Sequence, residues 1–341
     1  MIMRTKTSAA VAGIAGLGLL LAACGGDDDG GSGGAEAGPA TVRIGYIPGP
    51  APAMNLLLAD ERGYFAENDI EVELTPFQTG ISLSNALTGG SIDIGVMGAV
   101  VANFPARGQG KLFLLNNLEA DIQQIWAAPD SGVESVADLA GTQVATTTGS
   151  AAHLLLHVAL EAEGVPAEDV EIVNLDMPAV ANTFVTGGIG AAALWAPFDT
   201  QVEEQLPDAT LIATSADYEE AAIAGGWVAN NDFYADHADT LARLAEVWLR
   251  SNEDLTADRD AALAEACPRL EEFMTVETCI EIYGKTQTFT NDEWAAYYED
   301  GTALDWVGRM EQVFVDIGAL PEFVEPEKYF DTSIYTDAVG S

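Results

Sequence analysis

Four short segments of the chain combine glycine, hydroxyl and aromatic residues in a way that suits the binding of a small anion. They are Thr79-Gly80-Ile81-Ser82, Gly98-Ala99, Thr148-Gly149-Ser150 and Trp195-Ala196-Pro197. In each of them the pattern predicts that a strand ends and a helix begins. A helix start offers unpaired N–H groups and a partial positive charge, and ligands of open α/β sheets collect at the ends of the strands. The segments therefore favour a negatively charged or strongly polar solute, although any one of them can also be a routine helix cap.

The elements that position these segments alternate between short β-rich runs and helical runs, which is typical of α/β folds. In the first series, strands at 42–47, 70–77, 92–97 and 112–117 alternate with helices at 53–62, 81–87 and 99–107. In the second series, strands at 143–147, 170–175, 191–195 and 210–213 alternate with helices at 150–163 and 179–186. Beyond Trp227 apolar residues recur at helical spacing. We expect two α/β lobes and a helical C-terminal part that packs on one of them.

The N-terminal segment has the pattern of an export leader. An apolar run at 9–21, too short to span a bilayer, ends in Leu21-Ala22-Ala23-Cys24. This arrangement resembles a bacterial lipoprotein signal, which implies removal of residues 1–23 and lipidation of Cys24. An ordinary secretory signal is the alternative. Residues 24–40 are predicted to be a flexible tether, so we expect a lipid-anchored protein on the extracytoplasmic face of the cell membrane.

The charge balance is strongly acidic. The chain has 54 acidic against 13 basic residues and a formal net charge of −41, which makes nucleic acid an implausible partner. The acidic surface fits a salty habitat, with improved solubility as the alternative. The hydrophobic fraction of 48% excludes a disordered chain, and the body is longer than one compact core usually organises.

Two further cysteines, Cys267 and Cys279, follow the leader in a chain expected outside the reducing cytosol. We therefore predict a disulfide between them. Closing so short a loop contributes about 2–3 kcal/mol by constraining the unfolded chain. The histidines at 153, 157 and 237 are distant in sequence, so we expect neither a metal site nor a cofactor.

Two stretches of the body carry a resemblance to a known family. They are residues 77–82 followed by 86–95, and residues 171–175 followed by 191–197. They resemble the extracytoplasmic solute-binding proteins of ABC importers, in the branch that serves taurine, aliphatic sulfonates, nitrate and thiamine-precursor pyrimidines, and most closely its taurine-binding members. The resemblance implies a two-lobed periplasmic-binding-protein type II fold, joined by two crossing hinge strands. Such proteins close on a solute and dock on a membrane permease.

The resemblance also implies where the lobes meet. The crossings are expected near residues 123–128 and 225–229. Lobe 1 would then comprise residues 41–125 and 229–341, including the helical C-terminal part, and lobe 2 residues 126–228. The protein is expected to be a monomer.

Carried over residue by residue, the resemblance implies a ligand-binding set from both lobes. Its members are Gly80, Ile81, Ser82, Gly98 and Ala99 on one wall, Ser150, His153 and Trp195 on the other, and Gln123 and Trp227 at the hinge. Backbone N–H groups and the hydroxyls of Ser82 and Ser150 could satisfy the three oxygens of a sulfonate without an arginine. Structural roles in a helix start or in the core remain the alternative for His153, Trp195 and Trp227.

Taurine also carries an ammonium group, which requires a carboxylate. The hinge positions where the family leads us to expect one hold Gln123 and Gly225. Glu119, Asp121 or Asp199 could supply the acid if they face the ligand. If they point to solvent, a plain sulfonate or another neutral-polar solute is favoured.

We therefore predict a lipid-anchored binding protein that captures a small sulfonate-type solute and delivers it to an ABC permease. Binding of nitrate or of a thiamine-precursor pyrimidine is the first alternative, and presentation of the solute to a sensor kinase is another. An enzyme is a further alternative, since the fold also hosts a thiamine-pyrimidine synthase. The chain has no Gly-x-Ser-x-Gly elbow, and Ser150 with His153 at i, i+3 is a weak nucleophile and base pair, so we predict that it is not an enzyme.

Overall fold

The computed structural model describes residues 39–218 and 221–340. The leader, Cys24 and the tether up to residue 38 lie outside the described residues. Within the described ranges, no helix is both long and apolar enough to cross a membrane.

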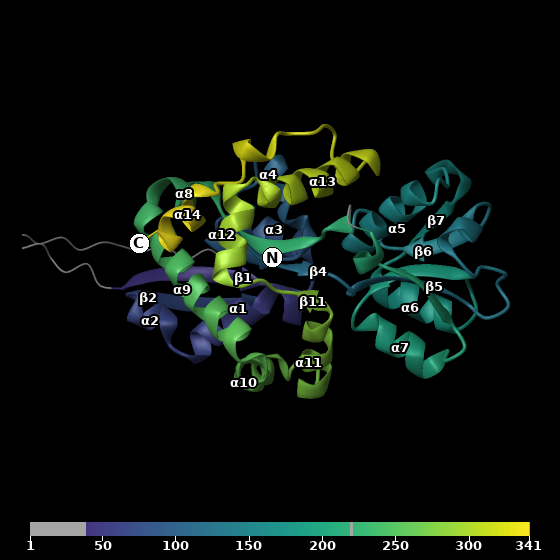
Figure 1. Ribbon diagram of the computed structural model, residues 1–341, viewed down its shortest axis with the longest axis horizontal. Helices are drawn as coiled ribbons and strands as arrows, with labels where there is room; N and C mark the ends of the chain where they lie inside the picture. The colour runs from purple at the N-terminus through teal and green to yellow at the C-terminus, as the bar shows by residue number, and fades with distance from the viewer. Residues whose placement is uncertain (1–38, 219–220, 341) are drawn as a thin grey trace, which may run out of the picture. The chain divides into compact units, whose positions relative to one another are not determined.

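The first lobe is built on a six-stranded mixed sheet in the order β11-β4-β10-β3-β1-β2 (Figure 1). Its strands are β1 (Ala40–Tyr46), β2 (Ile70–Pro76), β3 (Ile94–Met97), β4 (Lys111–Glu119), β10 (Ala224–Ala229) and β11 (Thr286–Gln287). The sheet is accompanied by α1 (Pro50–Glu61), α2 (Tyr64–Glu67), α3 (Gly80–Thr88), η1 (Ala99–Val101) and α4 (Asn103–Ala106). β1 runs parallel to β2 and β3, whereas β10 runs antiparallel to β3 and β4. The carboxyl ends of β1, β2 and β3 thus share one edge.

The second lobe is built on a five-stranded sheet in the order β7-β6-β8-β5-β9. Its strands are β5 (Gln123–Ala127), β6 (Gln143–Thr146), β7 (Glu171–Asn174), β8 (Ala191–Trp195) and β9 (Thr210–Thr214). Its helices are η2 (Val136–Leu139), α5 (Ala151–Ala162), η3 (Ala167–Asp169), α6 (Met177–Val185), α7 (Phe198–Gln205) and η4 (Ser215–Asp217). Helices α5, α6 and α7 gather around this sheet in Figure 1.

The C-terminal part is helical, as predicted, and packs mainly on lobe 1. It comprises α8 (Asn231–Asp236), α9 (Ala238–Ala257), α10 (Arg259–Ala266), η6 (Cys267–Leu270), α11 (Val276–Gly284), α12 (Asn291–Glu299), α13 (Thr302–Asp316), η7 (Pro326–Lys328) and α14 (Ser333–Val339). Residues 50–59 of α1 are all buried, because the helix is covered by the sheet and by α9, α10 and α11. α13 also reaches α5 of lobe 2. A disulfide between Cys267 and Cys279 joins η6 to α11.

The chain crosses between the lobes at residues 120–122 and again between η4 and β10, because β5 lies in the five-stranded sheet and β10 in the six-stranded sheet. The expected division at 125/126 and 228/229 would cut through these two strands. The predicted helix at 99–107 is also divided, into η1 and α4. Pro105 has no N–H to donate, so a continuous helical hydrogen-bond ladder cannot pass through this position. α7 and the two-residue strand β11 were not predicted from the sequence.

Candidate functional site

The Thr79–Ser82 turn of lobe 1 is capped by its own side chains. Thr79 Oγ1 accepts a hydrogen bond from Ser82 N (3.1 Å), and Ser82 Oγ donates to the carbonyl oxygen of Thr79 (2.8 Å). A Cβ added to Gly80 would lie 3.0 Å from Val100 Cγ2, so the turn packs against η1. Ile81 is 69% exposed. The turn therefore offers a ligand the N–H groups of a helix start, whereas the hydroxyl hydrogen of Ser82 is already engaged.

The turn before α5 in lobe 2 is organised in a similar way. Ser150 Oγ accepts from His153 N (3.4 Å), and His153 Nδ1 accepts from the N–H of Gly149 (3.1 Å). Burial, with the charge of His157 second, lowers the pKa of His153 to about 4. The imidazole is therefore neutral near pH 7 and holds the turn together, which is the structural role that the sequence left open for His153. Within the described chain no hydrogen bond joins the imidazole to the hydroxyl of Ser150.

Trp227 does not lie at the hinge. Its side chain is 0% exposed and sits on β10, between β3 and β4, where its ring packs edge-on against Phe113 with centroids 6.4 Å apart. A tryptophan on a central strand that is covered on both sides fills the core. The structure therefore gives Trp227 a place in the core, which is the structural alternative that the sequence left open for it.

Asp199 is 0% exposed and already has a cation. Its carboxylate pairs with Lys285 Nζ and accepts from Gln124 Nε2 (3.2 Å) and from Thr200 N (3.0 Å). Burial lowers the pKa of Lys285, but the hydrogen bond and charge of Asp199 outweigh it and raise that pKa overall. Because Lys285 follows α11, the pair joins the C-terminal helices to lobe 2. The carboxylate of Asp199 is therefore already compensated by Lys285 and by two hydrogen bonds within the described chain.

Glu119 lies at the end of β4, where the chain crosses to lobe 2, and it is 7% exposed. Its Oε2 accepts from Gln123 Nε2, and Gln123 Oε1 lies 3.1 Å from Ser215 Oγ. A Cβ added to Gly98 would lie 2.6 Å from Glu119 Oε1, so the carboxylate occupies the space beside this glycine. Burial raises the pKa of Glu119 to about 7, against the smaller opposite effect of Gln123.

Asn117 lies two residues before Glu119 and therefore on the same side of β4. It is 1% exposed, and neither of its side-chain polar atoms has a hydrogen-bond partner in the described chain. It pairs with Gly225 across the sheet, next to a β-bulge. A Cβ on Gly225 would lie 3.0 Å from Asn117 Oδ1 and 3.7 Å from Gly98 Cα. Asn117 was not predicted as a site residue from the sequence. The glycine pair at 225–226 in a buried strand was the local signal of this close approach.

Trp195 lies beside this group. It is the cross-strand partner of Gln123, is partly buried, and packs edge-on against Phe198 with centroids 6.2 Å apart. The next residue, Ala196, belongs to a small apolar cluster that both lobes share, completed by Ala51, Ile122 and Ile282. The structure thus brings Gly98, Gln123 and Trp195 of the predicted set to one crossing. The buried Ala99 is the first residue of η1, and the Thr79–Ser82 turn packs against Val100 of the same element.

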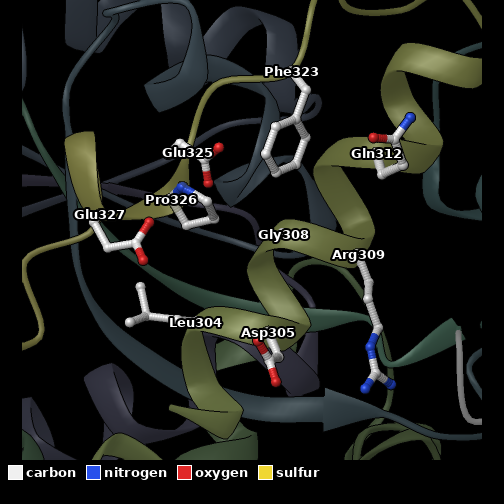
Figure 2. A pocket seen from close by; sticks show the side chains of 9 residues that line it. All are labelled: Leu304, Asp305, Gly308, Arg309, Gln312, Phe323, Glu325, Pro326 and Glu327. Carbon is white, nitrogen blue, oxygen red and sulfur yellow. The ribbon is translucent and has the colours of Figure 1, made fainter.

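A surface pocket of about 490 Å³ lies elsewhere, on α13 and the segment that follows it (Figure 2). It is lined by Leu304, Asp305, Gly308, Arg309, Gln312, Phe323, Glu325, Pro326 and Glu327. The charged side chains of this lining are the acids Asp305, Glu325 and Glu327 and the base Arg309, all labelled in Figure 2. This acidic lining does not suit an anion. In residues 39–218 and 221–340, no group of three or more His, Cys, Asp or Glu side chains is placed to hold a metal ion.

Comparison with known proteins adds to this geometry. A family model described as NMT1/THI5 like matches residues 52–262. A putative binding protein of Brucella abortus (strain 2308) is 24% identical over 298 residues, which cover 86% of this chain and 91% of that protein. The taurine-binding periplasmic protein of Escherichia coli (strain K12) is 26% identical over 235 residues, which cover 67% and 71% of the two chains.

Solved structures share the fold. The periplasmic aliphatic sulphonate binding protein SsuA from Escherichia coli matches with a TM-score of 0.68 at 20% identity, over 85% of this chain and 92% of that chain. The desulfurization enzyme DSZB matches with a TM-score of 0.62 at 16% identity, over 88% of this chain and 99% of that chain. The predicted periplasmic-binding-protein type II fold is thereby confirmed, and this fold serves binding proteins as well as an enzyme.

Proposed function

Because the chain belongs to the NMT1/THI5-like family, we propose that it is a lipid-anchored substrate-binding protein that captures a small sulfonate-type solute and delivers it to an ABC permease. The solute would bind between the lobes, where Gly98, Glu119, Gln123 and Trp195 meet at a crossing. Contacts from both lobes stabilise a closed state, and they shift closing by no more than the differential affinity for that state.

The observation that carries this proposal is the arrangement of helix starts at the strand ends of both lobes. α3 begins with a capped glycine turn beside η1, and α5 is capped by Ser150. Their free N–H groups can bind the oxygens of an anion without an arginine. The similarity to a taurine-binding protein over 71% of its length supports the same class of solute.

Isothermal titration calorimetry of the purified protein tests the proposal. The panel consists of taurine, an alkanesulfonate, nitrate and a thiamine-precursor pyrimidine. Heat from either sulfonate supports the proposed class. If only nitrate or only the pyrimidine produces heat, the protein binds that solute instead. If neither sulfonate produces heat, sulfonate capture is excluded.

The membrane anchor is a separate part of the proposal, because Cys24 lies outside the described residues. A diacylglyceryl group on Cys24 would keep the binding protein near its permease and raise its local concentration there. Mass spectrometry of the membrane-extracted protein should find the lipid on an N-terminal Cys24. Release of a Cys24→Ala variant into the soluble fraction would agree with it, and an unmodified cysteine in the wild type would contradict it.

An enzymatic function is not favoured by the site. Ser150 and His153 serve the α5 turn with their hydrogen bonds. The described part of the chain therefore provides no activated serine there.

A further inference from the structure

At the crossing from β4 to β5, the fold leaves several polar side chains incompletely paired. We define the crossing cluster as Asn117, Glu119 and Gln123, together with the glycines Gly98 and Gly225, which leave room for the first two side chains. Asn117 and Glu119 are on one side of β4, and Gln123 reaches them from the first position of β5. The cluster therefore joins residues of both lobes.

Glu119 retains one free carboxylate oxygen. Oε2 is engaged by Gln123, but Oε1 has no hydrogen-bond partner within the described chain. Oε1 lies beside the backbone of Gly98, at the strand-to-helix turn that borders the Thr79–Ser82 turn. An oxygen in this position can accept a hydrogen bond from a group that enters from the strand ends.

Asn117 presents a second unsatisfied group. Both of its amide atoms are buried and unpaired in the described chain. A buried polar group without a partner costs free energy, so native structures pair nearly all of them with protein, water or ligand. Its neighbour Asn116 shows the contrast, because Asn116 donates to the carbonyl oxygen of Pro52 (2.9 Å) and accepts from Trp248 Nε1 (2.7 Å).

No protein cation compensates the charge of Glu119 in the described chain. The described elements packed against Glu119 present only uncharged residues to it. These are Ile223 before β10, Gly225 on β10, Thr286 on β11, Gly98 before η1, Gln123 on β5 and Ser215 on η4. The charged residues nearest along these segments are engaged elsewhere. Asp121 accepts from Thr214 Oγ1 (2.9 Å), and Lys285 pairs with Asp199.

We propose that the crossing cluster binds the ammonium group of a zwitterionic solute, so that the protein selects aminoalkanesulfonates over plain alkanesulfonates and inorganic anions. This rests on the proposed function, whose sulfonate class it narrows. An ammonium group has three N–H donors, and Glu119 Oε1 and Asn117 Oδ1 are acceptors on one side of β4. A carboxylate at this position repels an anion, so the sulfonate end lies away from Glu119, towards the helix starts.

The test compares two solutes of equal heavy-atom number at pH 8. Taurine carries an ammonium group where propane-1-sulfonate carries a methyl group. The wild-type protein should bind taurine about 10- to 100-fold more tightly, which corresponds to a charge-assisted hydrogen bond in a buried site. The Glu119→Gln variant should lose most of this preference because it binds taurine more weakly. Its affinity for propane-1-sulfonate should be retained, which shows that the variant is folded.

Asp121→Asn is the matched control, because it removes an exposed acid from the same crossing and should keep the wild-type preference. Equal affinity of the wild type for both solutes, or an unchanged preference in Glu119→Gln, would overturn the assignment of the cluster and leave sulfonate capture intact. Absence of binding of both solutes to the wild type would overturn the proposed function itself, and this inference with it.

Discussion

Two buried carboxylates lie near the crossings between the lobes, and they differ in the partners that compensate their charge. Asp199 is paired with Lys285 and also receives hydrogen bonds from Gln124 and Thr200. Glu119 receives one neutral hydrogen bond, from Gln123, and has no cation within the described chain. Because a buried charge is costly unless it is paired, the first carboxylate serves the structure, whereas the second is left for a ligand to compensate.

Lys285→Met should have the largest effect on stability, because it would leave Asp199 buried and unpaired. Breaking a buried pair in this way typically costs about 3–5 kcal/mol of the free energy of unfolding. Urea unfolding at neutral pH measures the loss. The exposed Lys328 on η7 provides the control, since Lys328→Met should change stability by no more than about 0.5 kcal/mol.

A second substitution sharpens this result. Asp199→Asn in the Lys285→Met background removes the unpaired charge and should restore part of the lost stability. If Lys285→Met is as stable as the wild type, the ion pair does not have the structural role assigned to it.

Glu119→Gln should raise the free energy of unfolding at pH 8, whereas Lys285→Met should lower it. Burial raises the pKa of Glu119 to about 7 from the ordinary 4.5. Between these two pH values the folded protein keeps a proton that the unfolded chain releases, so the free energy of unfolding falls as the pH rises through this window. The shift corresponds to at most about 3 kcal/mol. The glutamine variant cannot ionise, so it should lack this decline.

Urea unfolding of both proteins at pH 4.5 and pH 8, without ligand, measures the difference. The two proteins should be similarly stable at pH 4.5, and the variant should be the more stable at pH 8. An identical pH dependence in the two would show that Glu119 is not held as an uncompensated carboxylate.

The contrast between the two acids also shows what the sequence can predict. Thr79 and Ser150 were recognisable as helix starts because capping is a local pattern of a hydroxyl three residues before the backbone N–H that it accepts from. The alternation of strands and helices likewise predicted the two lobes. These features depend on neighbours in the sequence.

The significance of Asn117 and Glu119 depends on non-local contacts. Gly98, Gln123 and Gly225 come from three different strands or strand ends, and their meeting cannot be read from spacing. The same holds for Trp227, which the family resemblance placed at the hinge. It is a core residue because β10 inserts between β3 and β4 of the first lobe.

Removal of the disulfide between Cys267 and Cys279 should lower stability by less than loss of the Asp199–Lys285 pair does. Cys279 lies in α11, which Lys285 follows, so the bond to Cys267 holds the helix that presents Lys285 to Asp199. Replacing both cysteines by alanine should lower the free energy of unfolding by about 2–3 kcal/mol. Thermal or urea unfolding measures it, and the preference for taurine over propane-1-sulfonate should not change. Loss of that preference would mean that the two carboxylates are not independent.

The most direct test of the role of Glu119 is the proton balance of binding. At pH 6 roughly nine-tenths of a group with a pKa near 7 is protonated, and a ligand ammonium group should drive that proton off. Calorimetry of taurine binding at pH 6, in buffers of different ionisation enthalpy, counts the protons released. We predict release of close to one proton by the wild type and of almost none by Glu119→Gln. A heat of wild-type binding that does not depend on the buffer would contradict the assignment of Glu119 as the partner of the ammonium group.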